Sequence, residues 1–337
     1  MSDAIRLMDA PPMPGLMFRS FRGAADLAGM AAVRAACALR DRVDDSSSVE
    51  SVSTLADLER RMVRSEGFDP ARDVLVAEVE GRIVGYSAAL WWTETDETWV
   101  YLTLGWVLSE WRGRGIGTAM LRWTEGRLHE LAASHRSQER AVLAANASER
   151  EVDTAALLVN EGYRVVFSVI ELGIDNLRGL RALPLPEGFV TRPVVSADLP
   201  ALYRSIDEAY LGDPFSESEP YEAWATQQAD LSTWHVAWDE ATGWIAGQVQ
   251  VVLFKGRGEV AEVSAGAPYR RRGLGRALLS RALLALREQG LTAARIHTLA
   301  ENPHRSWHLY ESVGFRVLKR FPRYRKAMNE LRPPESH

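Results

Sequence analysis

The stretch Arg270-Arg271-Arg272-Gly273-Leu274-Gly275 stands between a strand-like run and a long apolar helix. Glycine lets the backbone of such a turn pass close to a ligand. The helix that follows points unpaired backbone N–H groups and the positive end of its dipole at the same place. The stretch therefore predicts a turn that binds an anion.

A second stretch, Arg112-Gly113-Arg114-Gly115-Ile116-Gly117, has the same pattern and also lies between a strand-like run and an apolar helix. One copy could be an ordinary strand-to-helix turn that uses glycine for its dihedral angles. Two copies in matching contexts indicate an internal repeat. We therefore predict two such turns in a duplicated fold.

The segments around the two turns follow the same order in both halves of the chain. In the first half we predict strands at 16–21, 73–79, 82–88, 99–107, 141–144 and 165–174 and helices at 24–43, 55–64, 116–133 and 153–160. In the second half we predict strands at 189–193, 234–238, 244–254, 259–265, 294–298 and 315–326 and helices at 196–210, after 221, at 274–287 and at 303–313. This order predicts an α/β fold of two tandem domains, each a mixed sheet flanked by helices.

The length of the chain also favours two domains. A chain of 337 residues is long for one core, since domains usually hold roughly 100–200 residues. The segment 176–188 contains two prolines and two glycines and is the best candidate for a linker. We therefore expect one domain over 1–178 and a second over 179–337.

Composition and charge limit the classes of function. A net charge of −5 argues against broad binding to nucleic acid. Cys37 is the only cysteine, which excludes an intrachain disulfide and a cysteine-based metal site. The chain has no membrane-length apolar run, and its first 15 residues do not resemble a signal peptide. We expect no metal, no nucleic-acid or membrane partner, a cytoplasmic location, and a monomer or homodimer.

Further motifs support a family resemblance. The second turn follows Pro268-Tyr269, and Asn302 and Leu309-Tyr310-Glu311-Ser312-Val313-Gly314-Phe315 come after it. Together these residues resemble the GNAT acetyltransferase superfamily. The first half is similar to the same superfamily through Trp111 with its turn, and through Asn160-Glu161-Gly162-Tyr163. The resemblance covers nearly the whole chain and implies two GNAT-like domains that use acetyl-CoA as co-substrate.

The resemblance also implies which residues bind the cofactor. In this superfamily the backbone N–H groups of the turn bind the pyrophosphate of acetyl-CoA, and basic side chains add charge. Asn302 is expected near the pantetheine arm and, before Pro303, as a helix N-cap. The implied cofactor-binding residues are Arg270, Arg271, Arg272, Gly273, Leu274, Gly275, Arg276 and Asn302 in the second half, and Arg112, Gly113, Arg114, Gly115, Ile116 and Gly117 in the first.

Acetyl transfer to an amine also needs a proton acceptor for the amine and a proton donor for the leaving thiolate. The resemblance implies Tyr310 as the donor, since a phenol with a pKa of about 10 can serve a thiolate. Our candidate base is Glu262, on the strand before the turn; Glu259, His297 and His308 are alternatives. Alternation places Glu259 and Glu262 on opposite faces unless the strand bulges.

The first half lacks both of these polar groups. Aligning the repeats places Leu158 where the second half has Tyr310, and Leu104 where it has Glu262. We therefore expect catalysis in the second half. The first half is expected to be catalytically degenerate, although its turn can still bind CoA.

The acceptor is expected where the early helices of the second half meet the cleft. That region is rich in acidic and indole side chains, which would suit a cationic or partly aromatic amine, although a solvated loop and core tryptophans would give the same composition. The residues are Asp213, Glu217, Glu219, Glu222, Trp224, Trp234 and Trp238.

These observations predict an acetyl-CoA-dependent N-acetyltransferase for the primary amine of a small molecule. A non-catalytic acetyl-CoA-binding or sensing protein and a protein or peptide N-acetyltransferase are the alternatives, and self-protection against an amine antibiotic also remains open. The tandem layout is similar to that of mycothiol synthase, but no residue singles out its amino sugar–cysteine acceptor.

Overall fold

The computed structural model describes residues 4–50, 55–64, 67–137, 140–211, 215, 219–228, 230–302 and 304–328. The chain forms two compact units. The first takes the described residues of Met1–Thr93, Glu97–Val166 and Phe321–His337, and the second those of Glu94–Asp96 and Phe167–Arg320. A helix that could span a membrane, which needs about 20 apolar residues, does not occur in these ranges.

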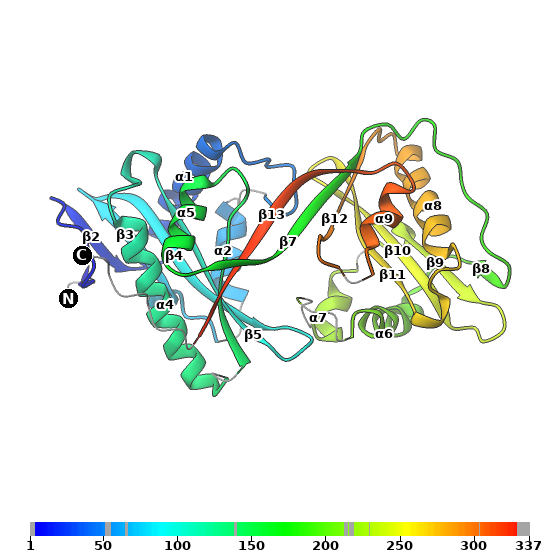
Figure 1. Cartoon of the computed structure of the whole chain (residues 1–337), viewed down its shortest axis with the longest axis horizontal. Helices are drawn as coiled ribbons and strands as arrows, with labels where there is room; N and C mark the ends of the chain where they lie inside the picture. The colour runs from blue at the N-terminus through cyan, green and yellow to red at the C-terminus, as the bar shows by residue number, and fades with distance from the viewer. Residues whose placement is uncertain are drawn as a thin grey trace. The chain divides into compact units, whose positions relative to one another are not determined.

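The first unit is a mixed sheet with helices on both faces (Figure 1). Its strands are β1 (Ala4–Ile5), β2 (Leu16–Ser20), β3 (Val74–Val79), β4 (Arg82–Thr93), β5 (Trp99–Val107), β6 (Ala141–Asn146) and the end of β13 (Arg316–Ala327), in that spatial order. Its helices are α1 (Ala24–Asp41), α2 (Leu55–Arg64), α3 (Pro70–Asp73), α4 (Ile116–His135) and α5 (Val152–Asn160). β5 and β6 are parallel, and the other described pairs are antiparallel.

Contacts through the sheet show which helix covers which face. Arg34 of α1 stacks on the ring of Trp106, 5.0 Å from its centroid. Thr124 of α4 bonds to Ser87 of β4 at 2.9 Å, from the other face. Side chains alternate along a strand, so this α/β layering follows from the strand periodicity read in the sequence.

The second unit repeats the plan. Its strands lie in the order β7 (Arg164–Ile174), β12 (Ala294–Leu299), β11 (Arg257–Ala265), β10 (Ile245–Phe254), β9 (Trp234–Asp239) and β8 (Phe189–Thr191). Its helices are α6 (Leu199–Tyr210), α7 (Tyr221–Thr226), α8 (Leu274–Glu288) and α9 (Ser306–Glu311). Leu202 of α6 accepts a hydrogen bond from Gln248 on one face, and Leu278 and Leu279 of α8 share a buried cluster with Val249 of the other. The predicted α/β class with two flanked mixed sheets is confirmed.

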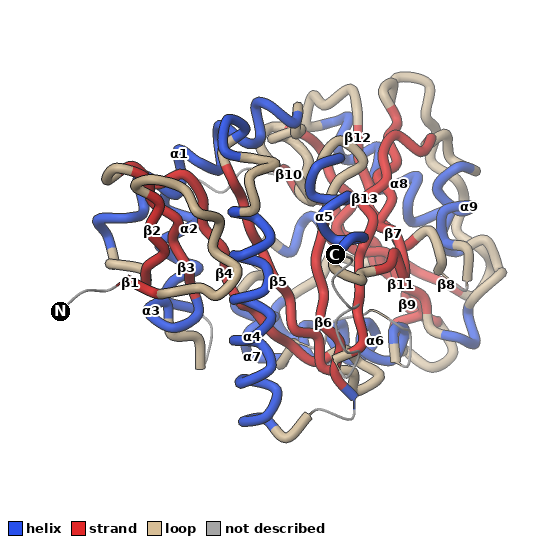
Figure 2. The backbone as a smooth tube through the Cα atoms, turned by 60° about the vertical axis from the view of Figure 1, so that its left-hand side comes forward, coloured by secondary structure: helices blue, strands red, loops and turns tan. Residues whose placement is uncertain are grey.

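The compact units do not follow the predicted boundary between residues 178 and 179. From Phe167 onward β7 belongs to the second unit, where Val169–Ile174 pair with β12. In exchange, the end of β13 pairs with β6 of the first unit, as Figure 2 shows. A buried ion pair between Lys326 of β13 and Glu125 of α4, at 3.0 Å with both side chains 4% exposed, fixes the exchanged strand. Each sheet therefore needs a strand from the other half of the sequence.

Most predicted elements are confirmed within a few residues. Two short ones, β1 and α3, were not predicted because two and four residues are too few to show a period. The helix predicted at 303–313 is shorter, since Arg305 has φ 48° and α9 begins only at Ser306. Pro303 lies outside the described residues.

Candidate active site

The turn of the second unit leads from β11 through one turn of 3₁₀ helix, Ala267–Tyr269, into α8. Gly273 caps the helix at φ 84°, a left-handed conformation that side chains rarely adopt. No side chain caps the first turn of α8, so its N–H groups remain available to a ligand. Leu274, the first helical residue, is 2% exposed and contributes its backbone only.

The second glycine of the motif has a different role. A Cβ at Gly275 would lie 3.1 Å from Leu309 Cδ2 of α9, which is closer than most side-chain contacts. Glycine therefore lets α8 and α9 approach each other. This matters for the site because α9 carries Tyr310.

Arg270 is used inside the fold. Its Nε donates to Ala265 O at 3.0 Å, its Nη2 donates to Ala209 O at 3.0 Å, and its Nη1 lies 2.8 Å from His304 Nε2. These bonds join the end of β11 to the end of α6. Arg270, which was predicted to bind phosphate, thus uses its side chain to hold two backbone segments together.

Three other arginines of the turn are exposed to solvent: Arg271, Arg272 and Arg276. Arg272 stacks on Phe189, 4.5 Å from the ring centroid. Arg271 has φ 64°, a left-handed conformation that costs a side-chain-bearing residue about 1 kcal/mol. Among the described residues none of the three makes an ion pair, so their charge is available for an anion at the turn.

Asn302 is not the helix N-cap that the sequence suggested. Its Oδ1 accepts the backbone N–H of His304 at 2.8 Å and closes a turn ahead of α9. Arg305 occupies the N-cap position instead. Asn302 does line the same cavity as the glycine turn, which leaves its predicted contact with the pantetheine arm as a prediction.

A cavity of about 1330 Å³ opens between the strands next to this turn. The parallel ladder of β11 and β12 ends at the pair Val260 and Ile296, and beyond it the strands diverge. The cavity is lined by the turn, by both diverging strands and by α9. It brings Glu262 and Tyr310 together with the turn, as the sequence predicted.

Glu262 lies at a β-bulge. The register with β10 shifts between the pairs Gln250–Glu262 and Val251–Val260, so Ala261 is the extra residue. The hydroxyl of Tyr210 of α6 donates a hydrogen bond that is shared between Glu262 Oε1 at 3.2 Å and Val263 O at 3.1 Å. Burial raises the pKa of Glu262 to about 7, against the opposing effect of the Ser264 and Tyr210 hydroxyls. At neutral pH this carboxyl group is therefore poised to exchange a proton.

The bulge corrects the prediction for Glu259. Glu259 pairs with Val252 and Glu262 with Gln250, two residues apart on β10, so both carboxylates lie on one face. Glu259 Oε1 lies 3.3 Å from His297 Nδ1, and Glu171 Oε2 lies 3.0 Å from His297 Nε2. The two carboxylates outweigh burial and raise the pKa of His297. Both ring nitrogens of His297 are engaged, so it has no free lone pair to act as the base, and Glu259 points to His297 and does not line the cavity.

Tyr310 is 4% exposed and reaches the cavity from α9. Burial raises its pKa well above the ordinary value, the Ser306 and Thr298 hydroxyls oppose this, and the charge of Glu262 raises it further. The phenol therefore keeps its proton throughout the neutral range. His308, the other candidate, is exposed and lies 3.4 Å from Glu311.

Sequence reasoning missed two aromatic residues that line the cavity. Tyr210 and Phe215 line it, and the ring of Phe215 stacks on Phe167 of the exchanged strand at 4.1 Å. No motif marks these positions; only the fold brings them together. The predicted indoles lie elsewhere: Trp234 and Trp238 are buried with α6, Trp224 packs against them, and none lines this cavity. Glu219 and Glu222 are exposed, and Asp213 and Glu217 lie outside the described residues.

The turn of the first unit has the same backbone but different charges. Gly113 and Gly115 have φ 69° and 87°, Ile116 is buried, and Gly117 faces Leu157. Arg112 Nε donates to Val107 O at 2.9 Å, the same clamp that Arg270 makes.

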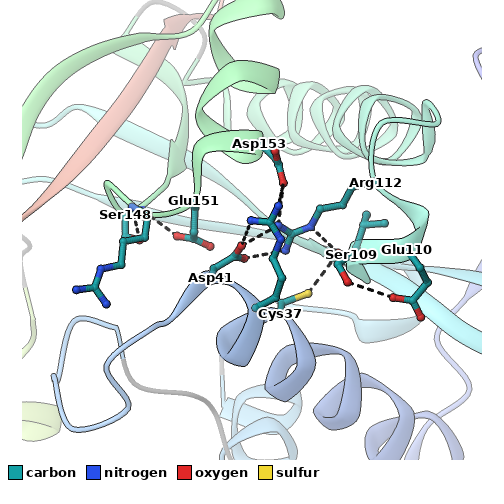
Figure 3. Close-up of polar contacts among 11 residues, drawn as sticks. Cys37, Asp41, Ser109, Glu110, Arg112, Ser148, Glu151 and Asp153 are labelled. Carbon is teal, nitrogen blue, oxygen red and sulfur yellow. Dashed lines mark hydrogen bonds and ion pairs between the residues drawn. The ribbon is translucent and has the colours of Figure 1, made fainter.

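Acidic residues surround this first turn. Asp41 accepts two hydrogen bonds from Arg112 at 2.8 and 2.9 Å, and Asp153 lies 3.2 Å from it (Figure 3). Arg114 lies over the ring of Trp111 at 5.2 Å. The turn borders a second cavity of about 770 Å³, which Leu104 and Leu158 line. The positions equivalent to Glu262 and Tyr310 are therefore apolar and line this cavity.

Comparison with known sequences gives the family. The sequence profile of the acetyltransferase (GNAT) family matches residues 40–151 and 199–315, which include both glycine turns. No curated protein was found to match the sequence. In the described parts of the chain, no group of three or more His, Cys, Asp or Glu side chains could hold a metal ion.

Solved structures share the fold of the whole chain. A GCN5-related N-acetyltransferase from Sphaerobacter thermophilus superposes with a TM-score of 0.73 at 23% identity, over 94% of this chain and 96% of that one. A tandem GNAT protein from the clavulanic acid biosynthesis pathway gives 0.63 at 17% identity, over 94% and 99%. A glucosamine N-acetyltransferase region of a fungal multi-domain β-N-acetylglucosaminidase gives 0.65 at 15%, over 94% and 39%. With two matched regions and two repeated sheets, this chain belongs to the acetyltransferase (GNAT) family and carries two GNAT domains in tandem.

Proposed function

We propose that the second unit transfers the acetyl group of acetyl-CoA to the primary amine of a small molecule. One observation carries the proposal: a single cavity joins an uncapped helix N-terminus, a carboxyl group whose pKa is about 7 and a buried phenol. The volume of about 1330 Å³ exceeds that of usual small-ligand sites. It has room for the end of a long co-substrate and a small acceptor.

The residues at the turn fit the phosphates of acetyl-CoA. The free N–H groups of the first turn of α8 and the exposed guanidinium groups of Arg271, Arg272 and Arg276 would hold the pyrophosphate. When bound, acetyl-CoA supplies a thioester, hence the acetyl group and a thiolate leaving group. The divergence of β11 and β12 beyond Val260 and Ile296 offers a path from the turn to Glu262.

Glu262 would accept the proton of the incoming ammonium group and free its lone pair. Near pH 7 about half of the Glu262 carboxyl groups are ionised, as a pKa of about 7 requires. Tyr310 Oη would donate a hydrogen bond to the leaving sulfur. The charge of Glu262 raises the pKa of Tyr310, so protonation of Glu262 makes Tyr310 a stronger donor after the amine has lost its proton.

The test is free-thiol release from acetyl-CoA with a panel of amines. The panel would hold aliphatic, aromatic and amino-sugar amines together with a lysine-containing peptide and a peptide with a free N-terminus. We expect release with at least one small amine and little with the peptides. Release with peptides alone would move the activity to protein acetylation. Tight binding of acetyl-CoA without release in any reaction would make the protein a sensor.

A further inference from the structure

The cavity of the first unit differs from that of the second in a residue that strand exchange supplies. Arg323 of β13 pairs with Asn146, the last residue of β6, and lines the cavity of about 770 Å³. In the second unit the residue paired with the last residue of β12 is Val169. The same place in the two cavities thus holds a cation in one and an apolar side chain in the other.

The guanidinium of Arg323 has unused hydrogen-bond donors. No hydrogen bond or ion pair joins it to another of the described residues. Burial lowers its pKa to about 10, and the only charge that opposes this is Glu151. The side chain is half-buried, so its guanidinium keeps some contact with solvent, and an anion in the cavity would replace the hydration that it has lost.

Arg34 of α1 lines the same cavity and is also incompletely bonded. Its Nη1 is buried and, within the described ranges, has no hydrogen-bond partner. Its Nη2 makes one long bond to Glu50 O at 3.4 Å. Arg34, Arg323 and Glu151 all line this cavity, and the charge of Glu151 acts on both guanidinium groups.

Two acidic side chains of this cavity, Glu151 and Glu50, accept hydrogen bonds from backbone N–H groups, and the third, Asp153, pairs with Arg40 and Arg112. Glu151 Oε2 accepts the N–H of Ser148 at 2.8 Å, as Figure 3 shows, and Glu50 Oε2 accepts the N–H of Asp44 at 3.3 Å. No hydrogen bond from Arg34 or Arg323 to Glu151 occurs among the described side chains. The site therefore has hydrogen-bond donors that lack acceptors.

The adjoining turn makes a phosphate ligand unfavourable. Asp41 and Asp153 pair with both Arg40 and Arg112, so these four side chains carry no net charge, and Asp153 stands where the second unit has Arg305. Thr118 stands where it has Arg276. A ligand with several phosphates would find fewer unpaired basic groups at this turn than at the second, whereas a small carboxylate needs only the arginines of the cavity.

We propose that the cavity of the first unit binds a small carboxylate, held by Arg323 and Arg34. Guanidinium and carboxylate match in two parallel hydrogen bonds, so either arginine can bind the ligand through both oxygens. The site needs strand exchange, because Arg323 comes from the far end of the chain. It does not depend on acetyl transfer in the second unit.

The test is calorimetric titration of the full-length protein with acetate, succinate, glutamate and citrate, and with succinamide as a neutral analogue. We expect saturable binding of at least one carboxylate, and none of succinamide. Arg323→Met should weaken that binding at least tenfold. Arg281→Met, which removes an arginine of α8 in the second unit, is the matched control and should leave it unchanged.

Three results would overturn the proposal. One is the absence of saturable binding by all four carboxylates up to about 10 mM, a concentration at which a dissociation constant of 1 mM would be plain. Another is carboxylate binding that survives Arg323→Met. The last is binding of a second equivalent of CoA that is lost in Arg323→Met and is not displaced by carboxylates. If Arg323→Met fails to fold, Arg34→Met takes its place with the same expected tenfold loss.

Discussion

The two glycine turns share a backbone and differ in charge. Gly115 and Gly273 cap their helices at nearly the same φ, and Arg112 and Arg270 both donate Nε to the carbonyl five residues earlier. Around this common frame the second turn carries three exposed arginines without ion pairs among the described residues, whereas the first carries one such arginine, Arg114, beside Arg112, which is paired with aspartate. The backbone of the turn is therefore a property of the fold, whereas its fitness for phosphate depends on side chains that can change freely.

The same comparison separates the two cavities. In the first unit β4 and β5 pair without interruption, while in the second the equivalent strands β10 and β11 carry a bulge at Ala261. Glu262 lies next to the bulge, whereas Leu104, at the equivalent position, lies in the regular ladder of β4 and β5. A bulge re-aims a side chain next to a site. The chemistry proposed for the second unit thus depends on a local irregularity that the first lacks.

The largest effect that would sharpen the comparison is at Tyr310. Tyr310→Phe removes the hydroxyl and keeps the ring, so we expect turnover to fall about 10²–10⁴-fold, as for loss of a general acid. Binding of acetyl-CoA should stay within about twofold, because phosphate contacts are untouched. The measurements are steady-state thiol release and calorimetric binding of CoA.

Leu158→Met is the matched control in the first unit. Leu158 is buried at the equivalent position, and methionine conserves its volume, so activity should stay near wild type. Wild-type turnover in Tyr310→Phe, or an equal loss in both variants, would show that the two cavities do not differ in the way proposed.

Sequence reasoning succeeded where the signal is local. The turns and the flanking helices follow from short motifs and periodicity, and so does the equivalence of Leu158 and Tyr310 in the two repeats. The long-range features were not predictable in this way. A strand that ends in the other unit carries the same alternation as one that stays, so the exchange of β7 and β13 left no trace in the sequence.

The roles of arginine and glutamate show a second limit. As arginines of the glycine turns, Arg270 and Arg112 were predicted to bind phosphate. Only the fold shows that they donate hydrogen bonds to backbone carbonyl groups instead. Glu259 and Glu262 were expected on opposite faces unless the strand bulged, and the bulge, which no residue type marks, puts them on one face. Tyr210 has no motif, since it reaches Glu262 from a helix 52 residues away.

A smaller effect is expected from making the second turn more like the first. Arg271→Gly copies Gly113 and relieves a left-handed conformation, so the free energy of unfolding should rise by up to about 1 kcal/mol or stay constant. Loss of a charged contact to phosphate should weaken acetyl-CoA binding about tenfold. Thermal unfolding and calorimetry measure the two quantities.

Arg114→Ala supplies the control for this prediction. Arg114 occupies the position of Arg272 in the neutralised turn, and its removal should leave CoA binding unchanged. Weaker binding in both variants would indicate that the first turn also contributes to the measured affinity.

Substitution of Tyr210 is expected to shift the pH dependence of activity. The first unit has no equivalent of its bond to Glu262, because Leu104 stands in place of the carboxylate. The hydrogen bond from Tyr210 stabilises ionised Glu262 and so lowers the carboxyl pKa. Tyr210→Phe should therefore raise that pKa by about one unit and move the acidic limb of kcat/KM to higher pH. Activity should fall about fivefold at pH 7 and be unchanged near pH 9. A uniform loss at all pH values would indicate a structural role only.

The smallest effect concerns the glycines that let the helices approach. A Cβ at Gly275 would lie 3.1 Å from Leu309, whereas one at Gly117 would lie 3.4 Å from Leu157. Gly275→Ala should therefore displace α9 by a few tenths of an ångström, move Tyr310 with it and reduce kcat/KM about twofold, since productive geometry is sensitive to small shifts. Gly117→Ala makes an ordinary contact, and alanine favours a helix by about 1 kcal/mol over glycine. It should leave activity unchanged and raise the unfolding temperature by a few degrees. If the two variants behave alike in thiol release and in thermal unfolding, close packing of α9 is not what positions the phenol.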